Sequence, residues 1–269
     1  MEIRKILAFL KKDFLTEISY KLSFLLNIFS VSVSILTFFF IDKLFGHKMA
    51  PYLAPYGINY FAYVLIAIAF FSYVGTGLGS LSSRIRQEQM MGTLEAILVS
   101  PTKIPTFIIA LSLWNFIIAS IDVCVYLILG ALVFKVNFGN INILSSLVIL
   151  ILTVLTFNSL GVIAASFIIV FKRGNPVTWL MDSAFGLLGG VYFPVAVLPN
   201  WLRSISSLLP VTYAIKAMQL AVYKGYSLSQ LSSDLIILLF FTFMLLPLSM
   251  LSFKFALRKA KRQGNLLYY

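Results

Sequence analysis

Charged residues are scarce in this sequence of 269 residues, and so are histidine and cysteine. Only 11% of the residues are charged, whereas a soluble globular domain usually has about 25%. The single cysteine, Cys124, excludes an internal disulfide framework, and the single histidine, His47, leaves no cluster with the spacing of a zinc site. The composition therefore argues against a soluble enzyme or a disulfide-rich secreted domain.

Apolar residues are abundant instead: 60% of the sequence is hydrophobic and the mean hydropathy is +0.97. A soluble core of this size could not bury so much apolar surface. The sequence therefore predicts an all-α integral membrane protein, with a single transmembrane domain over residues 1–269 and no separate soluble domain. The net charge of +12 would indicate nucleic acid in a soluble protein, but here it orients membrane helices, so no nucleic-acid partner is expected.

Six stretches qualify as transmembrane helices, since a helix needs about 20 apolar residues to cross the hydrocarbon core. The predicted spans cover residues 22–44, 58–82, 105–134, 144–171, 177–193 and 232–256. The fifth stretch is short, whereas the third and fourth are long enough to tilt.

The basic residues predict the orientation of these spans. Fifteen of the 21 lie in the two terminal segments and in the loops after the second and fourth spans. The positive-inside rule places those segments in the cytoplasm. We therefore expect a multi-pass protein of the cell (plasma) membrane with both termini cytoplasmic, which an even number of spans permits.

The first 21 residues have the periodicity of an amphipathic helix. One face carries the apolar side chains, which are Ile3, Ile6, Leu7, Leu10, Phe14 and Ile18. Such a pattern predicts an interfacial helix on the cytoplasmic membrane surface, in contact with membrane lipids. The alternative is a cytosolic amphipathic helix that packs on a partner.

The loop after the second span is unusually polar for this chain. It carries Glu88 and Glu95 among basic residues, and Gly92 permits a tight turn before a short helix that Pro101 ends. A short helix presented to the cytoplasm is suited to docking on a soluble partner. The residues alone leave an ordinary solvated loop equally open.

The segment 194–231 after the fifth span is apolar but is interrupted by Pro194, Pro199 and Pro210. Non-helical backbone at membrane depth is tolerated only where protein or a cavity satisfies it. We therefore expect two short re-entrant outer helices, with Trp201 and Tyr213 near the interface. The alternative is an extracellular loop that lies on the bilayer.

Both segments resemble the signature stretches of the ABC type-2 transporter permease family. The cytoplasmic pattern is matched by Glu88, Gly92, Thr93, Leu94, Glu95, Ser100 and Pro101. The outer pattern is matched by Phe193, Pro194, Leu198, Pro199, Asn200, Trp201, Leu202, Pro210, Val211, Thr212 and Tyr213. One departure is Gln219, where many relatives have an arginine.

The resemblance implies the permease subunit of an ATP-driven ABC exporter. It implies a dimer, expected to be a homodimer, with two copies of a cytosolic ATP-binding cassette subunit. The cargo would be a hydrophobic drug, a lipid-linked glycan or a polysaccharide. Coupling to the ATPase would fall on Glu88, Gly92, Thr93, Leu94, Glu95 and Pro101. Because the chain has no phosphate-binding loop, it is not expected to be an enzyme or to hold a cofactor, and the partner subunit would bind ATP and Mg.

Asn115, Asp122 and Asp182 are polar residues within predicted spans. Intramembrane carboxylates are costly and are functional candidates by default. Asn115 and Asp122 share a helix face with Tyr126, which favours a structural hydrogen-bond network over a proton relay. Gly75 and Gly79 are spaced for close helix packing. No metal site or catalytic triad can be assembled.

Two other classes of function fit the sequence less well. A proton-driven secondary transporter often has paired repeats with interrupted helices in both halves, but here the interruption follows only the fifth span. A membrane-embedded enzyme would need convergent polar residues at a membrane edge, which the sequence lacks.

Overall fold

The computed structural model describes residues 2–19, 21–92, 104–171 and 176–262, and all regular secondary structure within these ranges is helical. The elements are α1 (Glu2–Ser19), α2 (Lys21–Leu53), α3 (Tyr60–Met90), α5 (Ile104–Leu132), α6 (Ile143–Phe171), α7 (Pro176–Leu188), the 3-10 turn η1 (Val195–Val197), α8 (Asn200–Ser206), α9 (Pro210–Tyr223) and α10 (Ser232–Arg262). The predicted all-α membrane fold is confirmed.

Five helices in the described ranges have the length and apolar composition to cross a membrane, namely α2, α3, α5, α6 and α10. Helices α8 and α9 together make a sixth candidate, but their axes are bent by 87°. The described part of α7 has 13 residues. At about 1.5 Å per residue it is roughly 20 Å long, shorter than the hydrocarbon core of about 30 Å.

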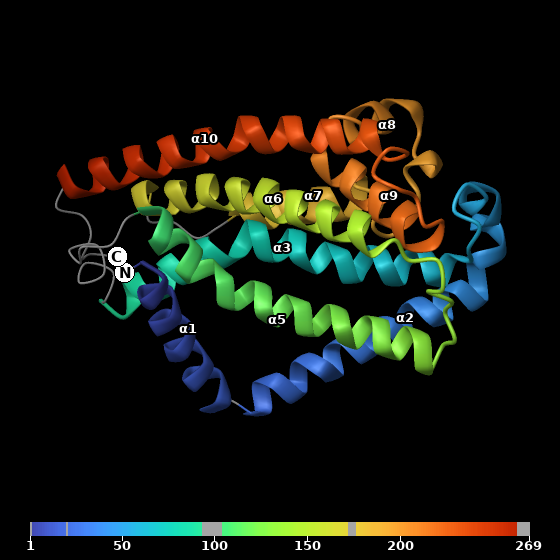
Figure 1. The fold of residues 1–269 in the computed structure, drawn as a ribbon, viewed down its shortest axis with the longest axis horizontal. Coiled ribbons are helices and arrows are strands. Elements are labelled where there is room, and N and C mark those ends of the chain that lie inside the picture. The colour runs from blue at the N-terminus through green and yellow to red at the C-terminus, as the bar shows by residue number, and fades with distance from the viewer. Residues whose placement is uncertain (1, 20, 93–103, 172–175, 263–269) are drawn as a thin grey trace.

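The long helices form one bundle in which α3 is central. Helices α3, α5, α6 and α10 run side by side, while α2 crosses the bundle obliquely (Figure 1). In the most apolar stretch of α3, 72% of the residues are buried inside the bundle, whereas the corresponding values are 11% for α2 and 22% for α10. We call the end where α1 begins and α10 finishes the terminal end, and the end with α8 and α9 the capped end.

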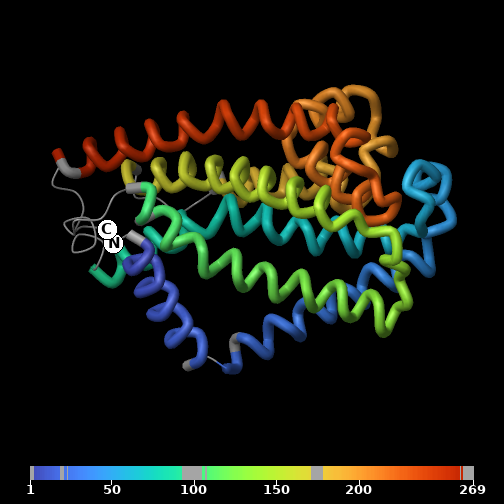
Figure 2. The backbone as a smooth tube through the Cα atoms, in the orientation of Figure 1, coloured from blue at the N-terminus to red at the C-terminus, as the bar shows by residue number. Residues whose placement is uncertain are grey.

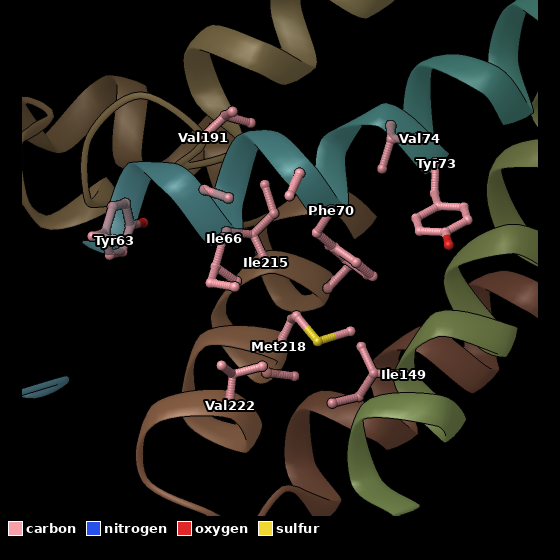
Figure 3. Close-up of a cluster of buried hydrophobic side chains, with 14 of the residues drawn as sticks. Tyr63, Ile66, Phe70, Tyr73, Val74, Ile149, Val191, Ile215, Met218 and Val222 are labelled. Carbon is pink, nitrogen blue, oxygen red and sulfur yellow. The ribbon is translucent and has the colours of Figure 1, made fainter. Parts of the chain in front are cut away.

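The main apolar core surrounds the half of α3 nearest the capped end. Ile66 and Phe70 of α3 lie against Met218 and Val222 of α9, with Ile149 of α6 beside them (Figure 3). A second, smaller core at the terminal end joins α3, α5, α6 and α10. Both cores lie inside the bundle, and many large apolar side chains face outward, as a lipid solvent requires.

Glycines permit the close approach of α6 and α7 to α3. A Cβ atom on Gly161 of α6 would lie 2.0 Å from the carbonyl oxygen of Gly77. On the neighbouring face of α3, a Cβ on Gly75 would lie 3.2 Å from a carboxylate oxygen of Asp182 in α7, and one on Gly79 would lie 4.0 Å from Thr178. The expected packing role of Gly75 and Gly79 therefore applies to the contact with α7.

Four helix ends differ from the predicted spans by five residues or more. Helix α2 continues past residue 44 to Leu53, α3 past residue 82 to Met90 and α10 past residue 256 to Arg262. Arginine, glutamine and glutamate favour helix, so the segment that we expected to be a loop from Arg84 onward is helical up to Met90. Helix α7 ends at Leu188 rather than near residue 193, because the chain turns through Gly190, whose φ is +84°.

Candidate functional site

The terminal end is held together by charged side chains that join α1 to α3. Helix α1 lies obliquely across this end of the bundle (Figure 2). The ammonium group of Lys12 lies 2.9 Å from a carboxylate oxygen of Glu88, and the guanidinium group of Arg84 pairs with Asp13. The side chains of Glu88 and Asp13 are only 3% and 2% exposed. Both carboxylates are thus buried and paired.

These contacts locate the first residue of the predicted coupling segment. Glu88 belongs to the last turn of α3 rather than to a loop, and Gly92 ends this helix with a φ of +69°. The Gly92 N–H donates to the carbonyl of Gln89 at 3.1 Å, and a left-handed glycine is a common helix terminator. The remaining predicted coupling residues, Thr93, Leu94, Glu95 and Pro101, lie outside the described residues.

The other predicted segment folds into two short helices at the capped end, and each of its prolines begins a helical element. Pro194 precedes η1, Pro199 precedes α8, and Pro210 is the first residue of α9. Pro210 occupies a first-turn position, where proline is favoured because its fixed φ suits the helix and it has no N–H to leave unpaired. We call η1, α8, α9 and the chain from Gly189 that leads into them the cap.

Hydroxyl groups tie the cap together through backbone carbonyls. Ser206 donates to the carbonyl of Leu188 at 2.6 Å, Thr212 donates to that of Ser206 at 2.7 Å, and Tyr213 donates to that of Ser207 at 2.7 Å. Phe193 is partly buried, whereas Trp201 is 66% exposed. An exposed indole at this end of the bundle is suited to a membrane interface.

Two tyrosines of α3, which the sequence analysis did not single out, anchor the start of the cap. Tyr63 donates to the carbonyl of Gly190 at 2.6 Å, and Tyr60 donates to that of Tyr192 at 2.9 Å. Gln219 of α9 is fully buried and donates to the carbonyl of Tyr63 at 2.7 Å. The departure at Gln219 thus places a neutral donor inside the main core.

The intramembrane polar residues do not gather at one point. The amide group of Asn27 in α2 donates to Asp122 in α5 at 2.7 Å, so the partner of Asp122 is a residue that the sequence analysis did not identify. Asn115 and Asp122 are both partly buried on α5. Asp182 lies on α7, and one of its carboxylate oxygens is buried without a hydrogen-bond partner in the described part of the chain.

A bundle of membrane-length helices with a charged junction at one end and a proline-broken cap at the other defines an α-helical integral membrane protein. The model of the ABC-2 type transporter family matches residues 4–223, which run from the first turn of α1 to the end of α9 and contain both signature segments. The chain belongs to this family. It is therefore an ABC permease subunit, a membrane transport component that works with a separate ATP-binding subunit. No curated protein matches the sequence.

Proposed function

We propose that this chain is the permease subunit of an ATP-driven exporter for a hydrophobic drug, a lipid-linked glycan or a polysaccharide. The observation that carries the proposal is the placement of the two family motifs. Glu88 and Gly92 lie at the terminal end and residues 193–213 lie at the capped end of the same bundle. This placement supports an ATPase contact near Gly92 on one side of the membrane and a cap on the opposite side.

The proposed orientation puts both termini and the ATPase in the cytoplasm of the cell, with ATP and Mg bound by the partner subunit. The asymmetry of basic residues supports it. The test is single-cysteine labelling in a Cys124→Ser background. Positions 5 and 265 should be protected from an external thiol reagent, whereas position 48 should react. External labelling of either terminal position would contradict the topology.

The coupling contact is proposed to be the segment from Gly92 to Pro101. Gly92→Pro should distort it, because proline requires φ near −65° whereas Gly92 has φ +69°. Glu95→Lys should remove a charge-assisted bond to the ATPase, worth about 1.5–3 kcal/mol. Both variants should insert normally and lose transport, and exposed Met91→Ala is the control. Unchanged transport in both would move the coupling contact elsewhere, with α1 as the next candidate.

The functional unit is proposed to contain two permease chains, identical to one another, and two ATPase subunits. Helix α2 supports this because little of it is buried within one chain, and Phe40 and Leu44 are among its exposed side chains. Cross-linking of single cysteines along the exposed face of α2 in native membranes should capture a dimer. A monomeric complex that is fully active would contradict the proposal.

The decisive measurement is transport by the chain reconstituted with its ATP-binding subunit in proteoliposomes. A hydrophobic fluorescent dye, a lipid-linked glycan and a polysaccharide are offered separately. The exporter function requires that one of them stimulates ATP hydrolysis and moves across the membrane only when ATP is present. Transport that persists without ATP and collapses with a protonophore would instead establish a proton-driven transporter.

A further inference from the structure

The terminal ends of α6 and α10 form a groove on the outside of the bundle. The two helices pack along one another (Figure 1). Between them lies a cavity of about 220 Å³, whose walls include Ile163 and Val170 of α6 and Ser252 and Phe255 of α10. Phe255 is 68% exposed. The groove is thus largely apolar and opens to the surroundings of the bundle.

A basic cluster continues this groove toward the end of α10. Lys259 lines the cavity, and it also lines an adjoining hollow together with Phe255, Arg258 and Arg262. These three cations are exposed, and no ion pair in the described ranges involves them. Lys12 and Arg84 differ from these three cations, because each of them is paired with a carboxylate.

The order of residues along α10 matches the depth profile of one membrane leaflet. Phe243, Leu251 and Phe255 are exposed apolar side chains, and the exposed basic side chains begin at Lys254 and continue with Arg258, Lys259 and Arg262. The change from apolar to basic occurs within one helical turn. Such a boundary is expected where a helix leaves the hydrocarbon and enters the headgroup layer.

We propose that this groove binds an anionic phospholipid, with an acyl chain between α6 and α10 and the headgroup phosphate on Arg258, Lys259 and Arg262. Basic pockets between transmembrane helices are suited to anionic headgroups. The basic cluster favours a negatively charged ligand. Because the apolar groove is continuous with this cluster, it favours a ligand whose negative group is attached to an acyl chain. A free phosphate or an acidic soluble protein would leave the apolar half unoccupied.

The test uses the purified full chain in detergent and counts bound lipid by native mass spectrometry. Phosphatidylglycerol is titrated beside phosphatidylcholine with the same acyl chains. The first variant combines Arg258→Gln, Lys259→Gln and Arg262→Gln. Each cation near an anionic lipid contributes roughly fivefold to affinity, so phosphatidylglycerol should bind about 100-fold more weakly. Binding of phosphatidylcholine should not change.

Two further variants separate the charge from the groove. The matched charge control combines Lys43→Gln, Lys48→Gln and Lys135→Gln, which removes the same charge from exposed positions toward the capped end and should leave tight binding intact. Ser252→Phe fills the groove without a change in charge and should weaken phosphatidylglycerol severalfold, whereas Ser252→Ala should not.

Three results would overturn the proposal. The first is equal phosphatidylglycerol affinity in the wild type and the α10 triple variant, or equal loss in the charge control. The second is competition by millimolar inorganic phosphate together with no effect of Ser252→Phe, which would show a simple anion site. The third is a disulfide between two copies carrying Phe255→Cys and Cys124→Ser, because a second chain would then cover the groove.

Discussion

The two ends of the bundle are fastened by different proportions of charged and neutral contacts. At the terminal end, α1 is joined to α3 by two ion pairs, Lys12–Glu88 and Arg84–Asp13. At the capped end, one ion pair joins α9 to α10, Lys216–Asp234, and most other contacts are neutral groups that donate to backbone carbonyls, as Tyr63 does to Gly190. Removing one partner of a buried ion pair leaves an unpaired buried charge, which greatly lowers the stability of the protein. Removing one neutral hydrogen-bond donor lowers the stability less.

This difference has a functional meaning under the proposed exporter mechanism. A junction that transmits force from an ATPase needs strong contacts between α1 and α3, next to Gly92. The cap needs to hold a broken helix pair in place, which several modest bonds can achieve together. The following predictions test whether the two ends differ in strength, in sensitivity to salt and in their effect on transport.

The largest effect is expected from Asp13→Ala. It removes a buried carboxylate and leaves Arg84, whose side chain is 17% exposed, without its partner on α1. Breaking a buried pair in this way costs about 3–5 kcal/mol, and the low end applies because the charge of Glu88 lies near Arg84. Unfolding by SDS in mixed micelles measures the loss. The exposed Lys11→Ala is the control, and an equal, small effect of both would show that the pair does not hold α1.

A smaller effect is expected at the capped end from Tyr63→Phe. The variant keeps the buried ring but removes the donor to Gly190, so this carbonyl loses a 2.6 Å bond. A lost hydrogen bond at a buried site costs about 1–2 kcal/mol. Tyr213→Phe removes an equivalent bond to Ser207 at an exposed site and serves as the control. The same unfolding assay should rank Tyr63→Phe above Tyr213→Phe, and the reverse order would show that the cap is not anchored through Tyr63.

Between the two ends, Asn27→Ala should cost about 0.6 kcal/mol, the average measured for hydrogen bonds between transmembrane helices. It removes the donor to Asp122. Asp122→Asn is the informative companion, because it removes the titratable group and keeps an oxygen acceptor. If Asp122 has only a structural role, the complex with Asp122→Asn should still transport its cargo. Complete loss of transport, with normal insertion, would instead favour a proton relay.

Much of this architecture follows from local sequence. The long apolar runs predict α2, α3, α5, α6 and α10. Inside a bilayer the backbone N–H and C=O groups must bond to one another, and a helix satisfies them all within one segment. Pro194, Pro199 and Pro210 predict where the chain between α7 and α9 breaks, and each of them begins an element. These features depend on near neighbours in the chain and on the solvent alone.

The contacts that connect distant segments could not be predicted in this way. Asp13 and Arg84 are 71 residues apart, and Asn27 and Asp122 are 95 residues apart. Nothing in the local pattern of either segment identifies its partner. The length of α3 was missed for a different reason, since the residues after residue 82 favour helix but their polarity indicated a loop. The buried role of Gln219, by contrast, depends on the position of α3 beside α9.

The smallest effect is expected from Lys12→Gln, and it sharpens the comparison because it isolates an exposed charge at the terminal end. The Lys12 side chain is 52% exposed, although its partner Glu88 is buried. Solvent and salt screen such a pair, so its loss should cost only about 0.5 kcal/mol. Glu88 also keeps a further interaction, so its carboxylate is not left without a partner.

SDS unfolding of the wild type and of Lys12→Gln at low and high ionic strength is the measurement. The difference between the two proteins should shrink as salt rises, whereas the cost of Tyr63→Phe should stay constant. A salt-independent cost of several kcal/mol for Lys12→Gln would show that this pair is shielded from solvent, and that both ion pairs fasten α1 equally.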